Sequence, residues 1–232
     1  MKIAGLQKVS LLDYPGHIAA SVFIAGCNLD CGYCQNRWMI DAAHVREAIS
    51  VPALLEWLHS RVGLLDGVCV SGGEPTIHAD LPDLLRQIRG LGLLIKLDTN
   101  GTRPQVLRAL LDAGLVDYVA MDLKAPLDAR YERMTGRVVE LADVRASMAT
   151  LRAWDSGARQ YEFRTTAGPG LDVAAVQEMA REIGALESWA LQLYVPPREA
   201  ATCPALSGDE LTSLAREFAV QVPRVSVRGV DR

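Results

Sequence analysis

Short apolar runs alternate with amphipathic stretches along most of this chain. The apolar runs are residues 17–25, 67–71, 93–99, 118–124, 161–166 and 189–195. The amphipathic stretches that follow them are residues 48–62, Leu81–Arg89, Pro104–Ala113, Leu141–Trp154, Val173–Ile183 and Asp209–Phe218. Apolar strands that alternate with helices are typical of a parallel sheet covered by helices. Six such units are too few for a closed eight-stranded barrel, so we expect an α/β fold with a partial (β/α)6 barrel that is open on one side. A doubly wound sheet is the alternative.

The composition is ordinary for a globular enzyme. Of 232 residues, 50% are hydrophobic and 22% are charged, and the net charge of -4 attracts neither nucleic acid nor an anionic membrane. No apolar run reaches the length of about 18 residues that a membrane span needs, and the amino terminus lacks the pattern of a secretory signal. We therefore expect one cytoplasmic domain over residues 1–232, with residues 196–232 packing on the barrel, and no nucleic-acid or membrane partner.

Three of the five cysteines lie together in the stretch GCNLDCGYCQN, residues 26–36, which follows the first apolar run. In a reducing compartment, clustered thiols more often bind metal or react than form disulfides. A structural zinc site has four closed ligands, whereas only Cys27, Cys31 and Cys34 are local here. Thiolates also hold iron–sulfur clusters, and three thiolates on a four-iron cluster leave one iron open. The spacing therefore favours a cluster over zinc.

Polar residues gather where the predicted strands end, which is where α/β folds place their sites. They are Gly72, Gly73 and Glu74 after the second strand, Asp98 and Thr99 on the third, Asp122 and Lys124 on the fourth, and Arg164 on the fifth. Glycines let a backbone approach a ligand closely, and a glutamate can accept a hydrogen bond from an ammonium group. Two carboxylates can hold a ribose hydroxyl or a monovalent cation, and the lysine and arginine can bind a carboxylate. Taken singly, each residue also fits a plain turn, a helix cap or a salt bridge.

Taken together, these motifs resemble a known family. CxxxCxxC with Tyr33 before its last cysteine resembles the cluster loop of the radical S-adenosylmethionine (SAM) enzymes, and SGGEP resembles their element for the SAM amino group. The opening SLLDYPGHIAASVFIAGCNLDCGYCQN, with DTNG, VDYVAMDLKAP, the TG at 135–136, RTTAGPG and VSVRG, is similar to the glycyl-radical-enzyme activating enzymes. The branch that it resembles most activates anaerobic ribonucleoside-triphosphate reductase. The resemblance runs from Ile3 to Gly229.

The resemblance implies a reaction and its cofactors. Such enzymes use a partial barrel of the radical SAM type to bind a 4Fe–4S cluster and SAM, and they accept one electron from a reduced flavodoxin or ferredoxin. They cleave SAM to methionine and a 5'-deoxyadenosyl radical, which removes hydrogen from the α-carbon of a glycine on a partner enzyme. The partner implied here is the anaerobic ribonucleotide reductase.

The resemblance also implies residue roles. It assigns the cluster to Cys27, Cys31 and Cys34, the SAM amino group to Gly72, Gly73 and Glu74, further SAM contacts to Asp98, Asp122, Lys124 and Arg164, and a monovalent cation to the oxygens of Asp98, Thr99 and Asp122. Some activating enzymes carry a histidine on the last barrel strand, where this chain reads LQLYVPP, so that SAM contact is unidentified. Pyruvate formate-lyase-type activators often carry DGPG where this chain reads DYPG, which favours the ribonucleotide reductase branch.

Three residues of reactive type receive no functional role. Cys69 lies in the apolar run GVCVS and is interpreted as a buried strand thiol, His78 is interpreted as a surface residue at a helix start, and Cys203 is unassigned.

Other functions stay open beside the activation of anaerobic ribonucleotide reductase. The chain can activate another glycyl radical enzyme, or act on a small molecule as 7-carboxy-7-deazaguanine synthase does. It can also be a non-enzymatic electron carrier that shares only the cluster. SGGEP and LDTNG argue against a carrier, since a carrier needs no SAM pocket. They do not distinguish the other candidates.

Overall fold

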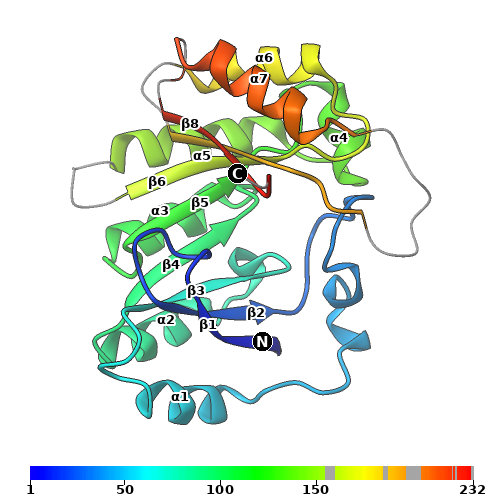
Figure 1. The fold of residues 1–232 in the computed structure, drawn as a ribbon. Coiled ribbons are helices and arrows are strands. Elements are labelled where there is room, and N and C mark those ends of the chain that lie inside the picture. Colours follow the sequence, from blue (N-terminus) through cyan, green and yellow to red (C-terminus); the bar gives the residue numbers. More distant parts are fainter. Residues whose placement is uncertain (155–159, 185–187, 197–204, 221, 223, 231–232) are drawn as a thin grey trace. The chain divides into compact units, whose positions relative to one another are not determined.

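The fold is taken from a computed structural model, which describes residues 1–154, 160–184, 188–196, 205–220, 222 and 224–230 (Figure 1). The chain forms two compact units that interleave along the sequence. The first contains residues 1–28, 36–120 and 142–160, and the second contains residues 29–35, 121–141 and 161–232. Each unit is described by itself.

The strands follow one another in the sheet in the order of the sequence. They are β1 (Ile3–Ser10), β2 (Ala19–Ile24), β3 (Gly67–Gly72), β4 (Leu94–Thr99), β5 (Tyr118–Asp122), β6 (Gln160–Thr166), β7 (Ser188–Gln192) and β8 (Arg224–Arg228). β1 pairs with β2 in the antiparallel sense, whereas the pairs β2–β3, β3–β4, β6–β7 and β7–β8 are parallel. The order leaves β1 and β8 as edges, so the predicted α/β fold with an open sheet is confirmed.

Helices connect the strands nearly as the sequence predicts. They are α1 (Val51–His59), α2 (Leu81–Gly90), α3 (Pro104–Asp112), α4 (Ala129–Thr135), α5 (Leu141–Trp154), α6 (Val173–Ile183) and α7 (Gly208–Phe218), with the 3-10 turns η1 (Arg37–Met39), η2 (Ala42–His44) and η3 (Pro75–Ile77). α5 and α6 have the predicted bounds. α1 begins later than residue 48 because the Ser50 side chain accepts from the Ala53 amide and fixes the helix start there.

The first unit has its apolar core on both sides of the β2–β4 strands. The strand residues Val22, Val68 and Ile95 are fully buried, and α2 presents Leu85 and Ile88 to the core. Such continuous burial is expected for parallel strands that carry helices. It leaves the strand ends as the places where polar groups can gather.

The second unit is held by polar and aromatic contacts at β6 and β7. The Trp189 indole donates to Thr165 Oγ1 at 3.0 Å, and its ring stacks on Phe218 of α7 with centroids 6.0 Å apart. α6 and α7 lie side by side near β8 (Figure 1). A capping box between Ser207 and Glu210 begins α7.

The structure contains two strands and a helix that the sequence did not predict: β1, β8 and α4. β1 and β8 lie at the sheet edges and are only partly buried, so their sequences lack a continuous apolar run. α4 is a short helix that begins at the Asp128 cap and ends at Gly136. β7 ends at Gln192 rather than at the predicted residue 195. The single domain over residues 1–232 and the packing of residues 196–232 on the barrel stay predictions, and residues 197–204, 221, 223 and 231–232 of that segment, with Cys203, lie outside the described residues.

No helix among the described residues is long and apolar enough to span a lipid bilayer.

Candidate functional site

The cysteine loop starts in the first unit and continues in the second. Cys27 follows β2, and its amide donates to the Ile40 carbonyl at 3.0 Å, which fixes the start of the loop. Cys31 and Cys34 belong to the second unit, where the Cys34 amide donates to the Cys31 carbonyl at 3.0 Å. None of the three forms a disulfide with another described residue, and Cys31 is buried while the other two are half-buried. Over the described ranges, no three His, Cys, Asp or Glu side chains are already arranged as a metal site.

In the second unit, Gly136 holds the middle of the cysteine loop. The Asp30 amide donates to the Thr135 carbonyl at 2.8 Å, and Gly136 has a left-handed φ of +66°. A Cβ at position 136 would lie 2.4 Å from the Asp30 carbonyl oxygen, a distance that real structures do not show. The TG motif therefore supports the cysteine loop through backbone contacts with Asp30, a role that its sequence alone did not reveal.

The SGGEP turn in the first unit packs against the chain that leads into Cys27. The Gly73 amide donates to the Ile24 carbonyl and the Glu74 amide to the Gly26 carbonyl, both at 2.8 Å. A Cβ on Gly73 would lie 2.0 Å from the Gly26 carbonyl oxygen, and one on Gly72 would lie 2.3 Å from the Ile24 amide nitrogen. The two glycines are thus required by the close approach of two backbone segments.

Glu74 is buried, with 1% of its surface exposed, and internal donors surround its carboxylate. Oε1 accepts from the Thr76 amide at 3.0 Å, from the Thr76 hydroxyl, and from Thr99 Oγ1 at 2.8 Å. Oε2 accepts from the Asn100 amide at 2.6 Å. Burial raises the pKa of Glu74, and the hydrogen bonds from Thr76, Asn100 and Thr99 oppose that rise. Thr76 and Asn100 are partners that the sequence did not identify.

Asp98 pairs with a lysine that the sequence did not single out. Lys96 Nζ contacts Asp98 Oδ1, and the Ser71 hydroxyl donates to Asp98 Oδ2 at 3.0 Å. The side chains of Lys96 and Asp98 are 2% and 12% exposed, so the ion pair is almost withdrawn from water. Cys69 is buried, as predicted for a strand thiol, and its Sγ lies 3.7 Å from both Lys96 Nζ and Asp98 Oδ1.

In the second unit, Asp122 lies between two cations. Lys124 Nζ donates to Asp122 Oδ2 at 3.0 Å, and Arg164 Nε donates to Oδ1 at 2.7 Å. Burial lowers the pKa of Lys124, but Asp122, Tyr33, Cys31 and Tyr131 together raise it well above its usual value. Burial also raises the pKa of the Cys31 thiol, against the opposing effect of Lys124. The structure therefore brings together three predicted residues: Asp122, Lys124 and Arg164.

The residues predicted to bind a monovalent cation have partners within the protein, and the cation site itself stays a prediction. Asp98 contacts the Lys96 ammonium, and Thr99 directs its hydroxyl to Glu74. Asp122, the third predicted ligand, belongs to the second unit and pairs with Lys124 and Arg164.

His78 is half-buried and lies against the start of the cysteine loop, in contrast to the predicted surface position. Its ring atoms would lie 3.4 Å from a Cβ on Gly26, and its Nε2 is buried with no hydrogen-bond partner among the described residues. Burial lowers the pKa of His78, so the neutral imidazole is favoured at this position.

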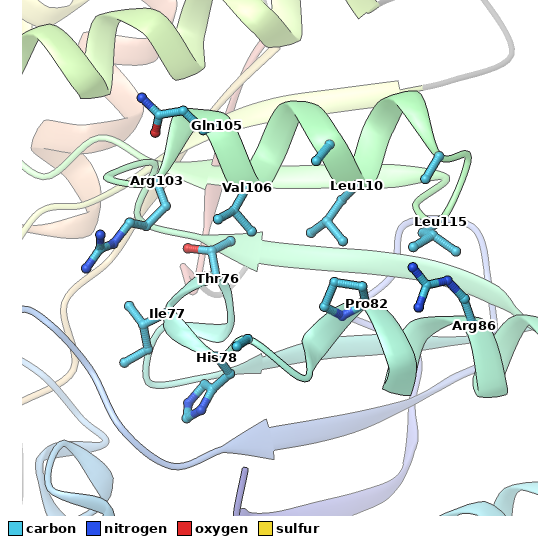
Figure 2. A pocket seen from close by; sticks show the side chains of 13 residues that line it. Thr76, Ile77, His78, Pro82, Arg86, Arg103, Gln105, Val106, Leu110 and Leu115 are labelled. Atoms are coloured by element: carbon cyan, nitrogen blue, oxygen red, sulfur yellow. The ribbon is translucent and has the colours of Figure 1, made fainter.

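A separate pocket of about 530 Å³ lies between η3, α2 and α3. Figure 2 shows Val106 and Leu110 of α3 pointing toward Pro82 of α2, with Arg103 and Arg86 at opposite ends. Its lining is mainly apolar, and it includes Thr76 and His78 but none of the residues predicted to bind the cluster or SAM. The pocket is therefore distinct from the strand-end residues.

An open α/β sheet with polar groups at the ends of its strands and a three-cysteine loop after β2 defines a class of cofactor-binding enzymes. The model of the radical SAM superfamily matches residues 21–183, so the chain belongs to that superfamily. Its members use a 4Fe–4S cluster and SAM. The radical SAM type of the predicted fold and the two predicted cofactors are thereby confirmed.

Individual relatives differ in what their names state. A Methanocaldococcus jannaschii protein named "Putative glycyl-radical enzyme activating enzyme" is 26% identical over 99% of this chain and 96% of its own length. A 7-carboxy-7-deazaguanine synthase of Thermococcus kodakarensis is 30% identical over 60% of each chain. The crystal structure of Streptococcus suis SuiB bound to S-adenosylmethionine has the same fold, with a TM-score of 0.65 and 13% identity over 90% of this chain. This chain spans 51% of SuiB, about half of that protein.

Proposed function

We propose that this protein is a radical SAM activase that generates a glycyl radical on a partner enzyme, and that the partner is an anaerobic ribonucleoside-triphosphate reductase. The observation that carries this proposal is the extent of the likeness to the M. jannaschii protein. It includes 99% of this chain and 96% of that one, so it extends beyond residues 21–183, which the superfamily model matches. The ribonucleotide reductase branch rests on the DYPG motif, which stands where pyruvate formate-lyase-type activators often carry DGPG.

Cys27, Cys31 and Cys34 are the proposed cluster ligands. Among the described residues none of the three forms a disulfide, and soft thiolates are the ligands that iron–sulfur clusters take. The loop that carries them is held by backbone hydrogen bonds at Cys27 and Cys34 and by the close contact of Gly136 with Asp30. The donor set thus fits the cluster that the superfamily uses.

The proposed SAM contacts lie at two groups of polar residues. Asp122, Lys124 and Arg164 carry one negative and two positive charges, so the trio has one net positive charge that suits the carboxylate of SAM. Glu74 is already engaged by internal donors, but each carboxylate oxygen has two lone pairs, so Oε2 can accept from the SAM ammonium beside Asn100. Asp98 is the proposed acceptor for a ribose hydroxyl.

The bound cluster and SAM supply the one-electron radical chemistry, with a reduced flavodoxin or ferredoxin as the proposed electron donor. The chain binds and orients SAM and keeps water away. Hydrogen abstraction needs no general base, which agrees with a site built from a carboxylate, a lysine and an arginine that are already paired with one another.

Electron paramagnetic resonance tests the proposal. Anaerobically reconstituted, reduced protein is mixed with SAM and the anaerobic ribonucleotide reductase from the same source. We expect a SAM-dependent glycyl doublet that is lost in Cys31→Ala and retained in Cys203→Ala, a cysteine with no proposed role. Neither a doublet nor 5'-deoxyadenosine from protein with an intact cluster would contradict the assignment.

A small-molecule radical SAM enzyme is the second candidate, favoured by the 30% identity to the T. kodakarensis 7-carboxy-7-deazaguanine synthase. The same experiment separates the two. Release of 5'-deoxyadenosine without a doublet on any glycyl radical enzyme of that source would favour a small-molecule substrate.

A further inference from the structure

Lys96 is an unusual residue for its position in the fold. It lies in the middle of β4, and its side chain is 2% exposed. Lysine is almost never buried to this extent unless it is paired, because removing an ammonium group from water is costly. Its partner is Asp98, two residues further along the same strand and therefore on the same face. The pair thus joins two residues of one strand.

Besides Asp98, a thiol and an aromatic ring lie near Lys96 Nζ. Cys69 is the residue of β3 that pairs with Lys96 in the sheet, and its Sγ lies 3.7 Å from Nζ. The Tyr118 ring centroid lies 5.9 Å from Nζ, within the range of a cation–π contact. The Asp98 carboxylate lies directly against the ammonium and carries the opposite charge.

Two of the predicted ligands for a monovalent cation diverge in the structure. Successive residues of a strand point to opposite faces, and Asp98 faces Cys69 and Ser71 while the Thr99 hydroxyl donates to Glu74. Thr99 Oγ1 also accepts from the Gly101 amide at 3.2 Å, and Thr99 is 3% exposed. An alkali cation at Asp98 would lie beside the Lys96 ammonium, which would repel it. The Thr99 hydroxyl is directed to Glu74 and would not serve as its ligand.

We infer that Lys96 is a built-in cation that takes the place of an alkali ion at Asp98, so that this protein binds SAM without sodium or potassium. The ammonium neutralises Asp98 and, with Ser71, fixes the carboxylate in one orientation. Lys96 is a positioning residue, since it acts through Asp98. The inference rests on the proposed function only for the part that concerns SAM.

The first test measures cation binding without SAM. Thermal unfolding of the cluster-loaded protein is compared in sodium, potassium and choline chloride of equal ionic strength. A cation that binds the folded state stabilises it by mass action, so we expect one midpoint in all three salts for the unaltered protein. In Lys96→Met, sodium or potassium should raise the midpoint above that in choline. A sodium or potassium shift in the unaltered protein would overturn the inference whatever the enzyme's substrate is.

The second test measures SAM binding by calorimetry in the same salts. The unaltered protein should bind SAM equally in each, whereas Lys96→Met in choline should bind about tenfold more weakly, because Asp98 is left buried without its cation. Lys8→Met on the exposed part of β1 is the matched control and should bind as the unaltered protein does. Lys96→Met that binds SAM normally in choline would refute the positioning role. If Lys96→Met does not fold, the salt dependence of the unaltered protein still decides the question.

Discussion

At the scale of single residues, the glycine at 136 has two separate reasons to lack a side chain. Its φ of +66° is unfavourable for other residues, and the Asp30 carbonyl occupies the space that a Cβ needs. Gly114 isolates the first reason, since its φ is +65° and nothing lies within 4 Å of its Cβ position. The pair allows the cost of the backbone conformation to be separated from the cost of the contact.

We predict that Gly136→Ala lowers the free energy of unfolding by at least about 1 kcal/mol more than Gly114→Ala does, since the first adds overpacking to the same backbone strain. Urea denaturation of both variants measures the difference. Gly136→Ala should also retain less iron per chain after reconstitution, because Asp30 lies within the proposed cluster loop. Equal destabilisation and equal iron content would show that Gly136 does not hold that loop.

At the scale of elements, an ion pair between a half-exposed arginine and a buried glutamate connects the edge strand β8 to β6. Arg228 Nη1 and Nη2 donate to the two oxygens of Glu162 at 2.8 and 2.6 Å, and the Glu162 side chain is 3% exposed. β8 itself pairs with β7, which lies between the two partners in the sheet. A bidentate contact of this kind fixes the register of the strand as well as its position.

We predict that Arg228→Met lowers the free energy of unfolding by about 3 kcal/mol, because it leaves the Glu162 carboxylate buried without a partner. Arg224→Met, on the same strand but exposed, is the control and should change stability by less than about 0.5 kcal/mol. Chemical denaturation followed by circular dichroism compares them. If the two variants were equally stable, β8 would be held by its backbone pairing alone.

Elements with a strong apolar period were predictable, and those at the edges were not. α5 and α6 match their predicted bounds because buried residues recur along one face, from Val144 to Trp154 and from Ala175 to Ile183. β8 was missed because it is a half-exposed edge strand whose ends are arginines. Its ion pair with Glu162 is a contact far away in the sequence that no local pattern reports.

The site could be predicted as a set of residues but not as a set of partners. The strand-end positions of Asp98, Asp122 and Lys124 follow from the alternation of strands and helices. Lys96 gave no signal, because a single lysine in an apolar run is normally read as a residue that reaches solvent. Its pairing with Asp98 depends on the burial of β4, which becomes visible only in the folded chain.

At the scale of the whole molecule, the chain passes repeatedly between the two compact units. Residues 29–35 and 121–141 of the second unit interrupt the first, and β5 contributes Tyr118–Ala120 to one unit and ends in the other. A unit that is built from several separated segments is fully folded only when all of these segments have packed together. We therefore expect the two units to fold as one cooperative domain, as the sequence predicts for residues 1–232.

The four tryptophans make this expectation measurable. Trp38, Trp57 and Trp154 belong to the first unit, and Trp189 belongs to the second, where it is fully buried against Phe218. In the triple variant that replaces the first three by Phe, tryptophan fluorescence reports on the second unit. In Trp189→Phe it reports on the first. We predict that, within each variant, the fluorescence transition in urea coincides with the transition in far-ultraviolet circular dichroism, at one midpoint and with one slope. Two transitions in circular dichroism, one matching each fluorescence signal, would mean that the units unfold separately and that the chain is two domains.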